Sequence, residues 1–385
     1  MQCKGRPQYF KKLKMTNSFF KFFTGKDNNV LVYIWPKQKL NREEENLLFK
    51  FCSIVDEKGV SVISDIGYEH FHFHRYIGAY ELITTSKKCK DLKSLPFVSD
   101  IFIAPSEFLR DFYKLVHAFE DFLSQGRFVY IDVLNLSLEP FVAYKYSEND
   151  PINVGTKKIT SLGVTIVMAA GNYGLQGENS LSTWVYAPWV ISVGASDVNG
   201  DYLADFSSIG SHKGSSFTGP TVVAAGINII SDWPIHLIKD EERLRRDLEL
   251  ITTESIFAQN GETIFVDNDY FYSHTVESGT SQAAPTIAGV SGILIMLRKH
   301  LHLDYRPAII KEILKEIARP MLDYKPHEVG AGFVNKKITM SYLENLDSGN
   351  LNSQYWPRNC NLIDILNKNT NPINIAIMDD GFSDN

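Results

Sequence analysis

The alternation of hydrophobic and polar positions changes in character along the chain. Residues 1–28 show no clean period, and we expect a loosely ordered arm there. From residue 29 onward, β-branched and aromatic runs alternate with stretches at helical spacing. In order, these predict a strand at 29–35, a helix that starts at Asn41 and stops at Gly59, strands at 60–64 and 71–82, a helix at 86–95 and a strand at 97–103. The order β-α-β-β-α-β predicts a small ferredoxin-like α+β module at 29–104.

A larger region follows, in which short apolar strands alternate with helical segments. The strands are expected at 128–138, 164–170, 190–193 and 222–229, and the helices at 107–125, 288–301 and 307–317. This alternation is typical of a mostly parallel sheet with helices on both faces, so we expect an α/β fold. A charged stretch at 239–254 is expected to be a solvated insertion helix, with a partner surface as the alternative.

Composition narrows the class of protein. The 385 residues are 44% hydrophobic and 22% charged, which is typical of a globular protein of two or three domains. A net charge of −6 makes nucleic acid a poor partner. The apolar stretch at 286–297 is about half of the ~20 residues that span a membrane, so we expect a buried core helix and no transmembrane segment. Four cysteines without a CxxC pair and the lack of a secretory signal favour a cytoplasmic location.

A run of small residues around Ser281 carries the strongest chemical signal. Gly279-Thr280-Ser281 leads into an apolar run that predicts a helix, and small residues allow close approach of a substrate backbone. A serine at a helix start lies where backbone N–H groups favour negative charge, which a nucleophile needs because its tetrahedral intermediate is an oxyanion. The same residues would also fit a turn that caps a buried helix.

A second signal is the apolar strand that starts at Val164 and ends in Ala-Ala-Gly-Asn. Asn172 follows the strand end without a bulky neighbour, so its amide can be aimed at a reacting carbonyl. The alternative is a turn that contains an asparagine.

These two motifs, in this order, resemble those of the subtilisin-like serine peptidases (subtilases). The resemblance spans about 130–335 and includes Asp132–Leu138, Trp189–Asp197, Phe206-Ser207-Ser208, Gly219–Ile229, Arg306–Pro320 and Gly330–Asn335. It implies a subtilase core that hydrolyses peptide bonds in peptide or protein substrates through an acyl-enzyme on Ser281. It also implies an oxyanion site made by Asn172 and the Ser281 N–H, and a substrate-binding lining of Ser137, Leu138, Glu139, Ala169, Ala170, Gly171, Gly279 and Thr280.

Glu139 departs from the family pattern, which has glycine there. Its carboxylate would favour basic substrate side chains, or it would point outward into solvent. Both interpretations stay open.

The resemblance also gives the 29–104 module an expected role. Subtilases commonly carry an inhibitor-like propeptide of this form, which assists folding and occupies the cleft, and Val98–Ala104 resembles its last strand. The module is therefore expected to be an intramolecular inhibitor, with processing within Pro105–Gln125.

The aspartate of the family's catalytic triad is expected at the C-terminus. Ile373–Gly381 is an apolar strand that ends in Asp-x-Gly, and it resembles the subtilase aspartate motif. Asp379 would orient the catalytic imidazole, although a strand ending in an acidic turn is the alternative. Because the family order is Asp, His, Ser, we expect a circular permutation. The expected domains are an arm at 1–28, the inhibitor-like module at 29–104, the core with the serine half at 105–335, and a linker with the aspartate strand at 336–385.

The catalytic histidine is not identified, because none of the ten histidines is followed by Gly-Thr. Three explanations are open, in order of preference: the chain is one piece of a longer product, a partner or second copy supplies the histidine, or the protein binds peptides without cutting them. His70, His72 and His74 share one strand face, where a metal cluster or a donated base is the alternative to a solvated surface. We predict no metal-binding residue and no organic cofactor; the resemblance implies that calcium is possible, at no identified site.

Overall fold

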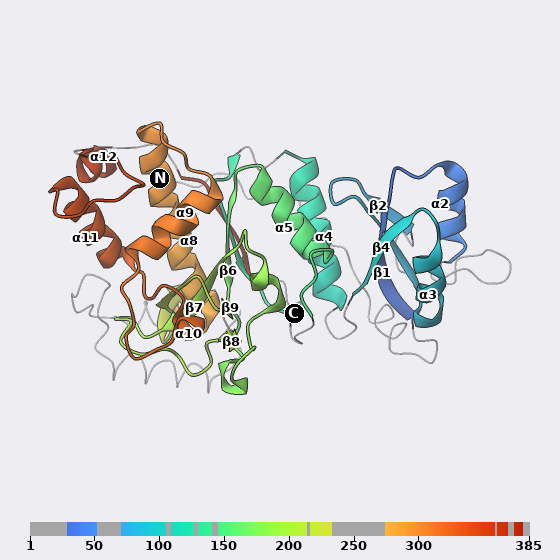
Figure 1. The fold of residues 1–385 in the computed structure, drawn as a ribbon, viewed down its shortest axis with the longest axis horizontal. Helices are drawn as coiled ribbons and strands as arrows, with labels where there is room; N and C mark the ends of the chain where they lie inside the picture. Colours follow the sequence, from blue (N-terminus) through green and yellow to red (C-terminus); the bar gives the residue numbers. More distant parts are fainter. Residues whose placement is uncertain are drawn as a thin grey trace. The chain divides into compact units, whose positions relative to one another are not determined.

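The computed structural model of the chain describes residues 29–51, 71–104, 109–126, 130–140, 145–213, 216–232, 274–358, 360–368 and 373–379. These residues form two compact units (Figure 1). The N-terminal unit comprises the described parts of Met1–Gly126 and Tyr146–Lys158, and the core unit those of Arg127–Lys145 and Ile159–Asn385. The predictions for the arm at 1–28, the strand at 60–64 and the charged stretch at 239–254 lie outside the described residues.

The N-terminal unit is built on a four-stranded antiparallel sheet in the order β2-β3-β1-β4. Its elements are β1 (Asn29–Pro36), α2 (Arg42–Phe49), β2 (Phe71–His74), β3 (Ala79–Thr85), α3 (Ser86–Ser94) and β4 (Val98–Ile103). Helix α2 begins with the expected capping box, in which the Asn41 side chain accepts from the Glu44 backbone N–H and the Glu44 carboxylate accepts from that of Asn41.

The two middle strands differ from the prediction of one strand at 71–82. The chain reverses between β2 and β3, where the Gly78 N–H donates to the His74 carbonyl at 2.7 Å. Gly78 has φ of +81°, a conformation that glycine adopts without strain. The apolar alternation runs on through this turn, so the pattern concealed it.

The two faces of this sheet have different covers. On one face, Val32, Ile34 and Leu82 pack with Leu48 of α2 and Leu92 of α3 in a hydrophobic cluster. On the other face lies α4 (Leu109–Ser124), whose Phe112 ring is 5.9 Å from the Tyr33 ring of β1 and stacks at 5.6 Å on Phe102 of β4.

The strand face that carries His72 and His74 is therefore covered, and the expectation that it is solvated is wrong. His74 is completely buried, whereas Phe73, which points to the opposite face, is 41% exposed. His70 lies outside the described residues.

The core unit holds a five-stranded parallel sheet in the order β10-β7-β6-β5-β13. The strands are β5 (Val133–Ser137), β6 (Thr165–Ala169), β7 (Ile191–Ser196), β10 (Val222–Ala225) and β13 (Ile375–Asp379). Every residue of β5, β6 and β7 is buried, as expected of a parallel sheet that is covered on both faces. The α/β prediction is confirmed.

Helix α8 (Thr280–His300) packs against β5, β6, β7 and β10. Among the described helices, α8 is the one that is long and apolar enough to span a membrane, and most of its apolar stretch is buried within the fold. The remaining helices are α5 (Pro151–Ser161), α9 (Pro307–Ile317), α10 (Pro326–Val329), α11 (Lys336–Asp347) and α12 (Leu362–Lys368). The smaller elements are β8 (Ser211–Lys213), β9 (Ser216–Thr218), β11 (Ile229–Asp232), β12 (His274–Glu277) and the 3₁₀ helices Gly174–Gln176 and Thr183–Tyr186.

Candidate active site

Three parallel strands of the core sheet end at one edge, where the candidate residues gather. In the pairing of β13 with β5, Asp379 lies opposite Ser137, so the last residues of both strands meet. Asn172 follows the end of β6. Carboxyl ends of parallel strands are the usual place for ligands in α/β sheets.

Ser281 lies in the first turn of α8 and is half-buried. Its hydroxyl makes no hydrogen bond within the described part of the chain. Its carbonyl oxygen accepts from the Ser137 hydroxyl at 2.9 Å, and that hydroxyl accepts in turn from Asn135 Nδ2 at 2.9 Å. The candidate nucleophile is thus tied through its backbone to the end of β5 while its hydroxyl stays available.

A proline explains why this carbonyl is available. Pro285 stands four residues after Ser281 inside α8 and has no N–H to give to the helix ladder. Ser137 supplies the missing donor. The helix starts at Thr280, earlier than the predicted 288.

Gly279 directly precedes the helix. Its N–H donates to the Gly226 carbonyl at 2.8 Å, and a Cβ on Gly279 would lie 2.7 Å from Gln282 Oε1. That oxygen is the tip of a flexible side chain and the next atoms lie at 3.6 Å, so a larger residue here would require only Gln282 to move.

The orientation of the Asn172 amide is fixed by three hydrogen bonds with two residues, Thr280 and Glu139. Its Oδ1 accepts from the Thr280 backbone N–H at 2.9 Å and from the Thr280 hydroxyl at 3.1 Å. Its Nδ2 donates to Glu139 Oε1 at 3.0 Å, and its backbone N–H donates to Glu139 Oε2 at 2.9 Å. The amide N–H that was expected to be free for an oxyanion is paired with a carboxylate.

Glu139 does not point outward into solvent, which was one of the two interpretations that the sequence left open; a preference for basic substrate side chains stays a prediction. Its carboxylate turns toward Asn172, and Gly171 makes room for it: a Cβ on Gly171 would lie 2.8 Å from Glu139 Oε2, and the residue has φ of +113°. Burial, together with the Glu139 charge, raises the pKa of the nearby Tyr173 hydroxyl. The sequence could not signal this pairing, because 33 residues separate its two members.

The other predicted lining residues lie along the same strand ends. Ala169 and Ala170 are buried at the end of β6, and Leu138 follows β5. The Gly171 N–H donates to the Thr280 hydroxyl at 3.2 Å, which joins the β6 end to the first turn of α8.

Among the side chains that the structure describes, no histidine forms a hydrogen bond with the Ser281 hydroxyl. His300 and His302 lie at the far end of α8, about 30 Å along the helix axis at 1.5 Å per residue. His274 opens β12, where its backbone pairs with Asp232.

A parallel sheet with a serine at a helix start and an asparagine at a neighbouring strand end is the arrangement expected of the class of subtilisin-like peptidases. The model of the Subtilase family matches residues 130–351, more than half of the chain, so the chain belongs to the subtilase family.

Curated relatives agree with this family. Serine protease AprX of Bacillus subtilis (strain 168) is 29% identical over 215 residues, which cover 53% of this chain and 42% of AprX. The CO(2)-response secreted protease of Arabidopsis thaliana is 33% identical over 93 residues, 24% of this chain and 11% of that protein. The chain spans less than half the length of these relatives. Among solved structures, the prenylagaramide maturation protease PagA is similar with a TM-score of 0.42 and 20% identity, over 60% of this chain and 68% of that one.

Proposed function

We propose that the core unit hydrolyses peptide bonds by acyl transfer to Ser281. The observation that carries the proposal is the placement of Ser281 in the first turn of α8, with its carbonyl tied to β5 and its hydroxyl without a hydrogen bond to any residue that the structure describes. The Ser281 oxygen attacks the substrate carbonyl while a histidine takes its proton. That proton then passes to the leaving amine, and water hydrolyses the acyl-enzyme.

The oxyanion of the tetrahedral intermediate would be held by the Ser281 N–H and by Asn172 Nδ2. In the structure, Glu139 accepts from that Nδ2. Glu139 occupies one of the two N–H groups of Asn172 Nδ2 and places a negative charge beside the donor, which would disfavour a second negative charge on the oxyanion.

Asp379 is proposed to orient the catalytic imidazole. Support comes from β13, which pairs in parallel with β5 so that Asp379 stands opposite Ser137, whose hydroxyl holds Ser281. In the family the aspartate strand precedes the serine in sequence, whereas β13 follows Ser281 and still joins the sheet beside β5. A circular permutation would produce this arrangement. The histidine would come from a further segment of a longer product, or from a partner or second copy.

The module at 29–104 is proposed to act as the inhibitory propeptide, with cleavage within Pro105–Gln125. Support comes from its β-α-β-β-α-β element order.

The Glu139–Asn172 pair favours a second function, peptide binding without cleavage. A carboxylate on the oxyanion donor, with no described histidine bonded to Ser281, suits a protein that keeps the cleft and has lost the chemistry.

Labelling with a fluorophosphonate, followed by intact mass, separates the two functions. The peptidase proposal expects one label per chain, either in this chain or in a version extended by its downstream coding sequence. The label should be lost in Ser281→Ala and kept in Ser348→Ala, a change at an exposed serine of the same unit. The absence of label from both folded proteins would favour peptide binding alone.

A further inference from the structure

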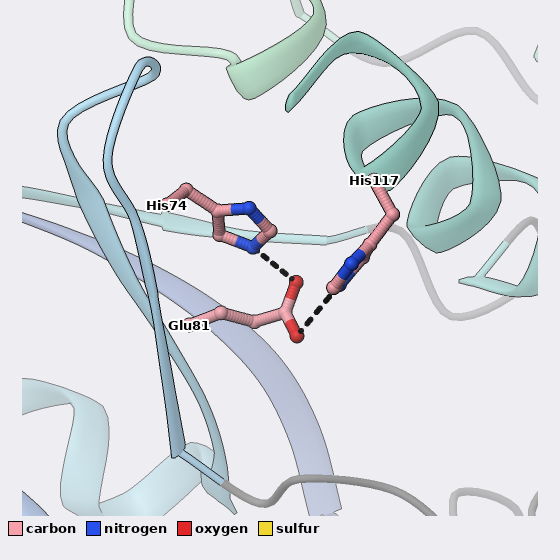
Figure 2. A group of neighbouring side chains, drawn as sticks. All are labelled: His74, Glu81 and His117. Atoms are coloured by element: carbon pink, nitrogen blue, oxygen red, sulfur yellow. Dashed lines mark hydrogen bonds and ion pairs between the residues drawn. The ribbon is translucent and has the colours of Figure 1, made fainter. Parts of the chain in front are cut away.

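A cluster of imidazoles surrounds one carboxylate in the N-terminal unit, apart from the candidate active site. His74 comes from β2, Glu81 from β3 and His117 from α4, and all three side chains converge on one point (Figure 2). We propose that these three residues bind a divalent metal ion of the zinc type. This proposal does not depend on the proposed peptidase function.

The spacing of the donor atoms fits a zinc ion. His74 Nε2 lies 3.0 Å from Glu81 Oε2, and His117 Nε2 lies 3.4 Å from Glu81 Oε1. One donor atom from each residue lies within 4.8 Å of the other two. Zinc bonds of about 2.0–2.1 Å at the tetrahedral angle separate two ligand atoms by about 3.3–3.4 Å. Small side-chain shifts would therefore place all three donors on one ion.

The chemistry of the donor set selects the kind of metal. Two imidazole nitrogens and one carboxylate are a ligand set that zinc uses when three protein groups bind it and water takes the fourth position. Calcium and magnesium prefer oxygen donors and would find only the carboxylate here. The centroid of a third ring, that of His72, lies 4.6 Å from that of His74 and 5.4 Å from that of His117, so a further imidazole lies beside the cluster.

Burial gives the cluster both rigidity and access. His74 and Glu81 are 0% and 1% exposed, so the sheet and α4 fix their positions, whereas His117 is 24% exposed. The partial exposure of His117 leaves one side of the cluster next to solvent, where water could take the fourth position on the ion.

An ion at this place would connect the sheet to the helix that covers it. Two ligands come from the β2–β3 hairpin, and the third comes from α4, in a part of the sequence outside the 29–104 module. Because a metal that binds only the folded arrangement stabilises it, the ion would hold α4 on the sheet.

Isothermal titration of the full chain, stripped of metal with a chelator, tests the proposal. We expect one Zn²⁺ per chain, no binding of Mg²⁺, and with Co²⁺ the intense visible absorption of a four-coordinate site. His117→Ala should weaken Zn²⁺ binding by at least about 100-fold. Loss of a residue that only supports a metal ligand can already cost on the order of 100-fold, and His117 would be a ligand itself. His300→Ala, at an exposed histidine of α8, should leave binding unchanged.

His117 is chosen because its partial exposure lets the variant fold, and circular dichroism checks that it does. Glu81→Gln is a second variant, which removes the carboxylate ligand with little change in side-chain shape. Failure of the wild-type chain to bind Zn²⁺, or equal binding by wild type and folded His117→Ala, would overturn the proposal.

Discussion

The hydroxyl of Ser137 at the end of β5 donates a hydrogen bond of 2.9 Å to the carbonyl oxygen of Ser281, 144 residues further along the chain. Pro285 makes this bond necessary, because it removes the donor that a regular helix would provide. The bond fixes the first turn of α8, and with it the candidate nucleophile, to the carboxyl edge of the sheet.

Ser137→Ala is expected to destabilise the core unit by about 1–2 kcal/mol, because it leaves the Ser281 carbonyl and Asn135 Nδ2 without their partner. Chemical denaturation measures the change. Ser348→Ala is the control at an exposed position. Equal stability of wild type and Ser137→Ala would show that water replaces the hydroxyl at no cost.

Glu139→Gly should accelerate fluorophosphonate labelling of Ser281, because it removes the carboxylate charge beside Asn172 Nδ2 and leaves both N–H groups of that amide for the developing oxyanion. A hydrogen bond to a charged group contributes about 1.5–3 kcal/mol, so an increase of roughly tenfold or more is expected. Glu139→Gln keeps an acceptor without the charge and should give a smaller increase. Slower labelling in the glycine variant would mean that Glu139 supports Asn172 rather than blocking it.

Gly155→Ala is expected to destabilise the N-terminal unit by about 1–3 kcal/mol, since the added Cβ would lie 2.6 Å from a ring carbon of Phe119 on α4. Gly289→Ala makes the same change in α8, where nothing lies within 4 Å of the new Cβ. There the better helix propensity of alanine should stabilise the chain by about 0.5–1 kcal/mol. Thermal unfolding of both variants checks the opposite signs, and a shared sign would contradict the packing around Phe119.

Lys311 should make stability depend on alkaline pH. Burial, aided by the charge of Lys315, lowers the Lys311 pKa to about 8 while its ammonium donates to the Pro188 and Val190 carbonyls. Between pH 8 and the ordinary lysine pKa near 10.4, Lys311 is mostly neutral in the folded chain but still protonated in the unfolded chain. Because the unfolded state binds more protons there, the free energy of unfolding rises with pH across this interval.

Relative to low pH, where Lys311 is charged in both states, its contribution to the free energy of unfolding should have risen by about 2 kcal/mol at pH 9.5. The difference in unfolding free energy between wild type and Lys311→Met, measured at pH 7.5 and 9.5, isolates it from other titrating groups. A difference that is the same at both pH values would contradict the depressed pKa.

Local motifs allowed the sequence to predict the parallel α/β core and the positions of Ser281 and Asn172. Each depends on residues close in sequence, such as the small residues before α8 or the apolar run that ends at Asn172. The α2 capping box was predictable for the same reason.

Long-range contacts escaped prediction. The Glu139–Asn172 pair joins two strand ends, and the cluster of His74, Glu81 and His117 joins a hairpin to a helix that packs over it. Periodicity describes which face a residue occupies but not what covers that face. For this reason His74 was expected in solvent and is buried.

The pairing of β13 with β5 has a consequence for synthesis. Val133 leaves the ribosome long before Ile375, its partner in the register, at translation rates that separate the two by roughly 10–50 seconds. During that interval β5 presents an open strand edge, the kind of edge on which chains aggregate. The sheet of the N-terminal unit, whose strands all emerge earlier, can assemble first. The core unit therefore completes its sheet only after nearly the whole described chain has been made, and its yield in a cell depends on how well that edge is shielded meanwhile.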